Sequence, residues 1–128
     1  MQHLPSINYK TIPAKKMRYV TAGDYFLLKD DVWHFRIAKM SDPRYEFLCL
    51  IHEEVEWFLT QQAGITEPMI AKFDMDHPKL DDPGTDKRAP YHKQHMMAMQ
   101  VEKLLARLMG VNWKKYDSQF NDLDYPKM

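Results

Sequence analysis

The segment that decides the fold runs from residue 42 to residue 64 and reads DPRYEFLCLIHEEVEWFLTQQAG. It opens with Asp42 and Pro43, a pair typical of a helix start, because aspartate can accept hydrogen bonds from the free N–H groups and proline tolerates the first helical position. Gly64 is a typical helix stop. The helix predicted over 43–63 carries large apolar side chains on nearly every side, so we expect it to lie buried in the middle of the domain.

Upstream of this helix, short runs rich in β-branched and aromatic residues predict a small antiparallel β-meander. The runs cover residues 17–21, 25–29 and 32–39, and turn residues separate them. Residues 1–15 contain two prolines among polar residues and show no clear period. We expect them to form an extended or partly disordered arm.

Downstream of the central helix, the pattern predicts a second, shorter helix followed by a long loop. Thr66 and Pro68 open this helix, and it must end near His77 because Pro78 follows. Residues 77–90 read HPKLDDPGTDKRAP, a stretch dense in proline, glycine and charge. Loops of this length in compact domains are typically functional or disordered.

Two further helices complete the predicted architecture. Pro90 begins a third helix that ends before Gly110, and Asn112 caps a short last one. The third helix has an apolar stripe at helical spacing, which we expect to face the core. The stripe consists of Met97, Val101, Leu104, Leu105 and Leu108. Met96, Met99 and Ala106 surround the side of His92, so we expect this helix to bury a second, smaller face that keeps the histidines inward. The predicted fold class is α+β, with an N-terminal antiparallel β-meander followed by three to four helices.

The composition limits both the domain count and the classes of partner. A chain of 128 residues that is 45% hydrophobic is the size of one domain with a real core, here 1–128. Lysine plus arginine and aspartate plus glutamate each total 18, so the net charge is zero. We therefore expect no generic nucleic-acid or membrane binding. The longest apolar stretch, 47–51, is far short of the about 20 residues that a membrane-spanning helix needs.

The single cysteine, Cys49, cannot form an internal disulfide, and the first residues lack the basic start and apolar run of a signal peptide. The sequence therefore predicts a cytoplasmic protein. No pattern indicates an oligomeric state.

A group of polar side chains on the central helix is the strongest functional signal. His52 and Glu56 lie one turn apart and point the same way, and Glu53 is adjacent. Because apolar residues share this face, we expect the convergent groups to be partly buried. A buried carboxylate costs several kcal/mol unless a cation or hydrogen bonds compensate. A metal ion is one such compensation.

His-Glu-x-x-Glu at 52–56, on a buried helix that follows a small sheet, resembles the zincin metallopeptidase arrangement. In zincins, His-Glu-x-x-His supplies two metal ligands one helical turn apart and a glutamate general base. The resemblance implies that His52 is a ligand, that Glu53 activates a water molecule, and that Glu56 replaces the second histidine. It also implies a peptide or amide substrate. We expect Zn²⁺, and a carboxylate in place of the histidine would also suit Mn²⁺ or Mg²⁺.

The third helix and the segment before it offer the remaining candidate residues. His92 and His95 lie three positions apart at a helix start, so either ring could supply a third ligand. Asp74 could orient a ligating imidazole. Tyr91 could donate a hydrogen bond to a substrate carbonyl.

The sequence is compatible with three functions. The first is a small metal-dependent hydrolase that attacks a peptide or amide carbonyl with an activated water. The second is a nucleotide pyrophosphatase, because Glu53-x-x-Glu56 also resembles half of the magnesium site of the all-helical MazG type. The expected Glu-x-x-Asp partner is absent at 69–74, and the predicted sheet is foreign to that fold. The third is a non-catalytic accessory domain with a structural polar or metal core.

Overall fold

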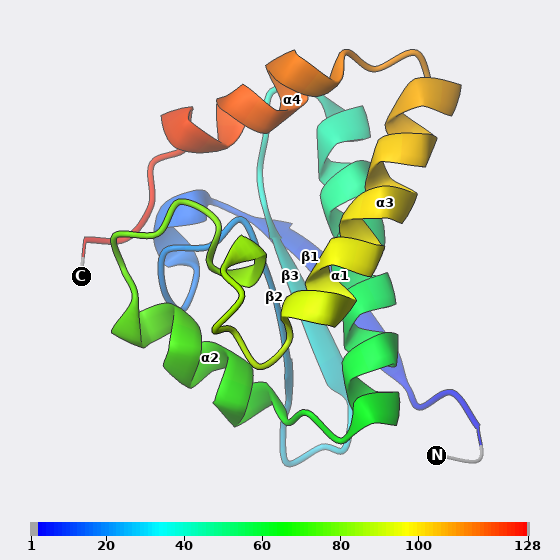
Figure 1. The fold of residues 1–128 in the computed structure, drawn as a ribbon, viewed down its shortest axis with the longest axis vertical. Coiled ribbons are helices and arrows are strands. Elements are labelled where there is room, and N and C mark those ends of the chain that lie inside the picture. Colours follow the sequence, from blue (N-terminus) through cyan, green and yellow to red (C-terminus); the bar gives the residue numbers. More distant parts are fainter. Residues whose placement is uncertain (1–2, 128) are drawn as a thin grey trace.

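The computed structural model describes residues 3–127 and has three strands followed by four helices (Figure 1). The strands are β1 (Ile7–Ile12), β2 (Gly23–Leu27) and β3 (Trp33–Ala38), and the helices are α1 (Pro43–Ala63), α2 (Glu67–Asp76), α3 (His92–Leu108) and α4 (Trp113–Gln119). The predicted α+β class is therefore confirmed. None of the helices in the described part of the chain has the length and apolar character that crossing a membrane requires.

The sheet differs from the predicted meander in its first strand. The strand order is β1-β3-β2, with β1 parallel and β2 antiparallel to β3. Residues 7–12 of the expected extended or partly disordered arm over 1–15 are extended and form an ordered strand of the sheet, while residues 1–2 lie outside the described residues. The side chains of β1 are almost all exposed, so its sequence carries no apolar alternation, and the strand is held by its backbone pairing with β3.

The expected strand at 17–21 is also wrong, because this segment belongs to no strand of the described structure. The side chains of Met17 and Tyr19 are buried, and the hydroxyl of Tyr19 donates a hydrogen bond to Asp74 on α2. The segment is therefore held by its side chains rather than by strand pairing.

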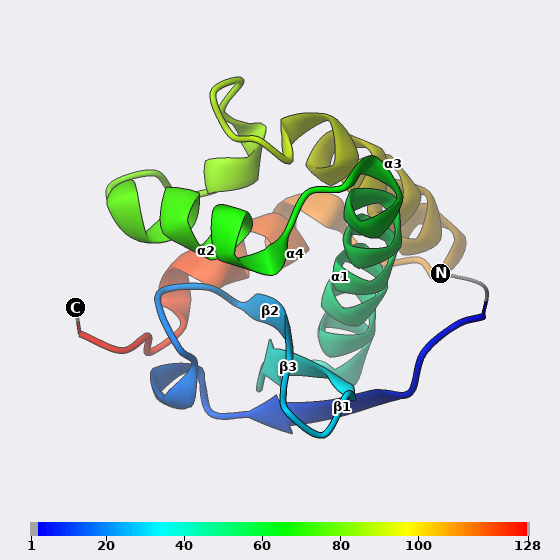
Figure 2. The same cartoon turned by 90° about the horizontal axis from the view of Figure 1, so that it is seen from below.

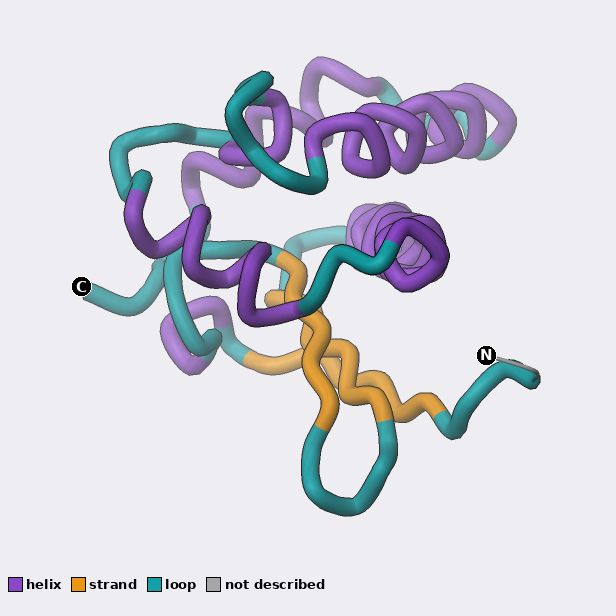
Figure 3. The backbone as a smooth tube through the Cα atoms, turned by 60° about the horizontal axis from the view of Figure 1, so that its bottom comes forward, coloured by secondary structure: helices purple, strands orange, loops and turns teal. Residues whose placement is uncertain are grey.

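Helix α1 has the predicted bounds, and the residues that set them behave as expected. Asp42 Oδ1 accepts a hydrogen bond from the Arg44 N–H at 2.9 Å, and Pro43 occupies the first turn. Gly64 ends the helix with φ 73°, a left-handed conformation that favours glycine. Helix α1 packs against β2 and β3 on one side and against α3 on the other (Figure 2). The long helices lie together on one side of the sheet, purple against orange in Figure 3.

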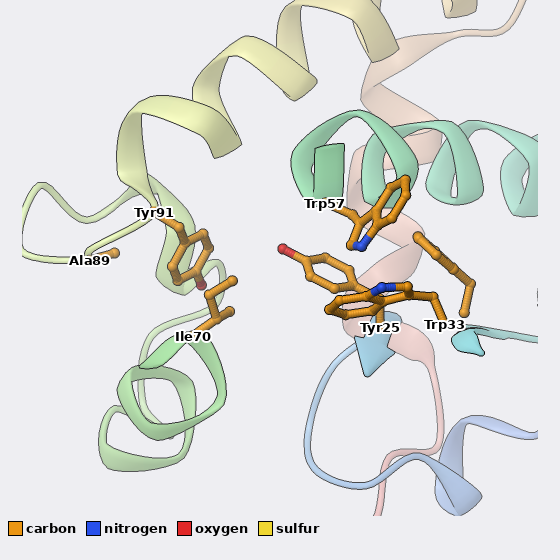
Figure 4. Packing of buried hydrophobic residues seen from close by; sticks show 7 residues of the cluster. Tyr25, Trp33, Trp57, Ile70, Ala89 and Tyr91 are labelled. Atoms are coloured by element: carbon orange, nitrogen blue, oxygen red, sulfur yellow. The ribbon is translucent and has the colours of Figure 1, made fainter. Parts of the chain in front are cut away.

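An aromatic cluster joins the sheet to α1. The ring of Trp57 on α1 meets Trp33 and Phe35 of β3 edge-on, at centroid distances of 5.7 and 5.6 Å. Edge-to-face packing is a favourable geometry for such rings. Tyr25 of β2 lies beside them, and its hydroxyl points away from Trp33 into the interior between the helices (Figure 4). This cluster fixes α1 on the sheet and places one polar group next to the site described below.

Helix α3 buries the smaller of its two predicted faces and exposes the main apolar stripe. The apolar stripe faces solvent: Met97, Val101, Leu104 and Leu108 are 42%, 37%, 44% and 71% exposed. Leu105, the fifth member, is half-buried against a second core cluster. The buried side of α3 instead consists of His95, Ala98, Glu102 and Ala106. The expectation of a core-facing stripe is wrong because the two buried polar side chains of α3 find partners on α1, and two alanines flank them at the contact.

The short helix α4 follows the predicted cap. Asn112 Oδ1 accepts a hydrogen bond from the Lys115 N–H at 2.9 Å. Tyr116 on α4 is fully buried in a cluster with Leu48 of α1 and Ala106 of α3. Helix α4 thus closes one end of the α1 and α3 pair and brings the hydroxyl of Tyr116 into the interior.

Candidate metal site

Three side chains from two helices meet in the interior and could hold a metal ion. They are His52 and Glu56, one turn apart on α1, and His95, on the facing side of α3. His52 Nε2 lies 3.1 Å from Glu56 Oε2 and 3.1 Å from His95 Nδ1, and the last two atoms are 2.8 Å apart. All three residues are less than a tenth exposed. This geometry supports the prediction that these side chains could hold a divalent metal ion.

The outward-facing atoms of this group are each held by another polar side chain. His52 Nδ1 lies 2.7 Å from Glu102 Oε1, and His95 Nε2 lies 3.1 Å from Asp82 Oδ1. Tyr25 donates a hydrogen bond of 2.9 Å to Glu56 Oε1. A carboxylate can only accept hydrogen bonds, so the outer ring nitrogens of both histidines carry the hydrogen. A neutral imidazole in that tautomer presents a lone pair at its inner nitrogen.

Hydrogen atoms alone do not satisfy the three contacts that His52, Glu56 and His95 make with one another. Three mutual contacts require three hydrogens, yet His52 Nε2 and His95 Nδ1 can carry only one each, and Glu56 is an acceptor. If both nitrogens carried one, two N–H groups would oppose each other across 3.1 Å. A cation satisfies all three lone pairs at once. Tetrahedral zinc with bonds of about 2.0–2.1 Å places its ligand atoms about 3.3 Å apart. The three distances here, 3.1, 3.1 and 2.8 Å, are somewhat shorter, so the side chains would move slightly apart around an ion.

The electrostatics of the group also favour a positive charge. Burial raises the pKa of Glu56, but hydrogen bonds from His52 and His95 outweigh it and hold that pKa down at about 2. Burial lowers the pKa of His52 and of His95, yet the carboxylates that face them reverse the effect. The pKa of His52 rises well above its usual value, and that of His95 rises to about 9. The carboxylates that face the two imidazoles thus favour a positive charge at this place.

Glu53 lies beside the ligand group but does not belong to it. Its carboxylate packs against Gly23 of β2, where an added Cβ would come within 2.5 Å of Glu53 Oε1. Within residues 3–127 its side chain makes no hydrogen bond. Burial, and then the nearby charge of Glu56, raise the pKa of Glu53 well above its usual value. Glu53 is therefore an unpartnered carboxyl group that glycine allows close to the sheet edge.

A pocket of about 870 Å³ opens onto these side chains. His52, Glu53, Glu56 and His95 all line it, and so does Asp74 of α2. A small molecule or a short segment of peptide would fit a pocket of this volume. The ligand group therefore forms part of a pocket wall rather than a closed core.

Of the two candidate histidines on α3, only His95 joins the group. His92 Nδ1 instead donates a hydrogen bond of 3.0 Å to the carbonyl of Gly84, in the loop that precedes α3. Gly84 also touches His95: a Cβ added at position 84 would collide with the imidazole ring. The loop at 77–91, which contains a short 3-10 helix at Pro83–Thr85, thus packs directly against His95.

Asp74 and Tyr91 make a hydrogen bond to each other rather than to the ligands. The hydroxyl of Tyr91 donates to Asp74 Oδ1, and that of Tyr19 donates to Asp74 Oδ2 at 3.1 Å. No hydrogen bond joins Asp74 to an imidazole in the described part of the chain. The ring of Tyr91 meets the ring of His95 edge-on at 5.9 Å. The carboxylates that contact the two candidate imidazole ligands are Glu102 and Asp82.

Sequence reasoning missed Glu102, although the sequence carries a signal for it. Glu102 is the one acidic residue of α3, and it lies seven positions after His95, two turns along the same face. Its second oxygen accepts a hydrogen bond from Tyr116. An isolated acid in register with a histidine on a mainly apolar helix is the pattern that could have indicated it.

A scan against protein-family models, a search of curated proteins and a search of solved structures each found no match.

Proposed function

We propose that this protein is a zincin-like metal-dependent hydrolase in which His52, Glu56 and His95 hold the ion. Glu53 is the general base for attack of water on a peptide or amide carbonyl. The observation that carries the proposal is that one lone-pair atom from each of three side chains converges at the wall of a pocket. The other polar atom of each side chain already contacts a neighbouring side chain. Such outer contacts orient metal ligands and fix the tautomer of ligating histidines.

The donor set favours zinc over magnesium. Two imidazole nitrogens and one carboxylate oxygen form a common zinc set, whereas Mg²⁺ prefers oxygen ligands and retains water molecules. Mn²⁺ is the second choice, because it accepts both imidazole and carboxylate ligands.

The pocket supports a catalytic rather than a purely structural role for the ion. Structural zinc sites are closed by four protein ligands, and catalytic sites use three and keep one position open. The described residues bring three ligands together, and those residues line a pocket. This favours the hydrolase over an accessory domain with a metal-stabilised core.

The chemistry divides between the ion and the residues beside it. A divalent ion held by His52, Glu56 and His95 would lower the pKa of water and polarise a carbonyl group. Glu53 makes no hydrogen bond in the described structure and lines the same pocket, so its carboxylate is free to take a proton from the attacking water and to pass it to the leaving amine. Tyr91 has its hydroxyl engaged by Asp74, and we give it no part in the proposed reaction.

Metal content is the direct test of the site. Tag-free wild-type protein is dialysed beside a His52→Ala, His95→Ala double variant and a His92→Ala control, and bound metals are quantified by mass spectrometry. We expect near-stoichiometric zinc in wild type and in the control, and loss of it in the double variant. Absence of metal in all three, with no thermal shift on addition of Zn²⁺, Mn²⁺ or Mg²⁺, would contradict the proposal.

Hydrolysis is tested with Glu53→Gln and its matched control Glu54→Gln. Glu54 is the next residue on α1, is half-buried and does not line the pocket. Removal of a general base typically costs 10²- to 10⁴-fold in rate. We expect a loss of about that size for Glu53→Gln on a library of short peptides, with retained zinc, and little change for Glu54→Gln.

A further inference from the structure

The walls of the pocket are strongly acidic. Nine of its lining residues are aspartate or glutamate, and Lys103 is the only lysine or arginine among them. The chain as a whole has a net charge of zero, so this is a local concentration of negative charge. Low-dielectric walls of one sign of charge concentrate ligands of the opposite sign.

Five of these nine carboxylates already contact a basic side chain. Arg18 lies 2.6 Å from both Asp24 and Glu67. Three more, Glu56, Asp82 and Glu102, contact the two histidines of the candidate metal site. The remaining four are Glu53, Asp74, Asp81 and Asp117, and no ion pair joins them to any residue between 3 and 127. One divalent ion would leave the pocket negative.

Asp74 is the one of these four whose carboxylate is held in place by two hydrogen bonds. It accepts from the hydroxyls of Tyr19 and Tyr91, both of which are buried. The Tyr91 ring in turn packs against the ring of His95. The carboxylate of Asp74 is therefore fixed by neutral donors one side chain away from the candidate metal ligands, without a cation of its own.

We propose that the substrate carries a positively charged ammonium or guanidinium group and that Asp74 binds this group. The inference rests on the proposed hydrolase function and names the charge of its substrate. Because the carboxylate of Asp74 has no cationic partner, an entering amine can form a charge-assisted hydrogen bond with it without breaking an existing ion pair. A phosphate or an acidic peptide would instead be repelled by the unpaired carboxylates.

Binding of three small amides to the full chain tests this inference. The ligands are N-acetyl-lysine amide, its uncharged analogue N-acetyl-norleucine amide, and the anionic N-acetyl-glutamate amide. Affinities are measured by NMR titration in Zn²⁺ and again in EDTA. We expect the lysine amide to bind about tenfold more tightly than the norleucine amide, and the glutamate amide to bind most weakly. The preference should shrink at high salt.

Asp74→Asn should bring the ratio between the lysine and norleucine amides close to one. Asp76→Asn is the matched control, since Asp76 lies one half-turn further on α2, is exposed, pairs with Lys72 at 2.8 Å and does not line the pocket. Equal binding of the two amides to wild type would overturn the inference, even if Asp74→Asn failed to fold. So would an unchanged ratio in folded Asp74→Asn. Because binding is measured without turnover, a lysine preference in a protein that hydrolyses nothing would support the charge inference and count against the hydrolase.

Discussion

Glu102 of α3 holds the outer nitrogen of His52, on α1, at 2.7 Å. The contact crosses the interface between the two helices that supply the candidate ligands, and the other oxygen of Glu102 accepts a hydrogen bond from Tyr116 on α4. The orientation of one imidazole thus depends on three helices. It also makes His52 more basic, which strengthens its inner nitrogen as a ligand.

Glu102→Gln should weaken zinc binding by about 10- to 100-fold, the usual cost of losing a carboxylate behind a ligating histidine. The amide keeps the shape of the side chain but removes the charge that fixes the tautomer of His52. Affinity is measured by competition with a chromophoric chelator. Glu54→Gln serves as the control and should bind zinc like wild type. An unchanged affinity in Glu102→Gln would show that this contact does not support a metal ligand.

Gly84→Ala should lower zinc affinity, because its Cβ would collide with the ring of His95. Gly64→Ala is the contrasting control: the new side chain meets nothing within 4 Å, but the φ of 73° is unfavourable for alanine. It should lower the free energy of unfolding by about 1 kcal/mol and leave zinc affinity unchanged. Chelator competition and denaturant unfolding on both variants separate the two effects. Equal zinc affinity in Gly84→Ala and wild type would contradict the tight packing of the loop on His95.

The parts of the fold that could be predicted from the sequence are those that depend on neighbouring residues. The bounds of α1 follow from Asp42, Pro43 and Gly64, which act within one turn of the helix ends. Strand β1 could not be found in this way, since its partner β3 is more than twenty residues away and its own side chains are exposed. A parallel pairing between segments that are distant along the chain leaves little pattern in the sequence of either strand.

The site could be predicted only in part for a similar reason. His52, Glu53 and Glu56 share one helix, so their spacing shows that they converge. The choice between His92 and His95 depends on how α3 turns toward α1, and an apolar period locates a stripe without saying which way it faces. The stripe of α3 faces solvent because His95 and Glu102, on the opposite side of the helix, form buried hydrogen bonds with α1. Burying these two side chains without hydrogen-bond partners would cost several kcal/mol.

Metal removal should lower the melting temperature of wild type more than that of the His52→Ala, His95→Ala double variant. An ion that binds only the folded state at about 100 times its Kd stabilises by about 2.7 kcal/mol. Melting is followed by circular dichroism in Zn²⁺ and in EDTA. The His92→Ala control should respond like wild type. The same response to EDTA in wild type and the double variant would mean that the ion acts elsewhere on the protein.

Asp74 should make the stability of the protein fall as pH rises from about 4 to about 6. Burial raises the pKa of Asp74 to about 6, against the lowering effect of its hydrogen bonds from Tyr91 and Tyr19. Because the folded pKa lies above the ordinary value of 3.8, the folded state binds more protons than the unfolded state in this window, and ionisation destabilises it. Unfolding of wild type and Asp74→Asn is compared from pH 4 to pH 8 in EDTA, so that shared titrations cancel. The difference should move in favour of Asp74→Asn as pH rises through the window and then level off. A difference that stays constant with pH would mean that Asp74 titrates alike in both states.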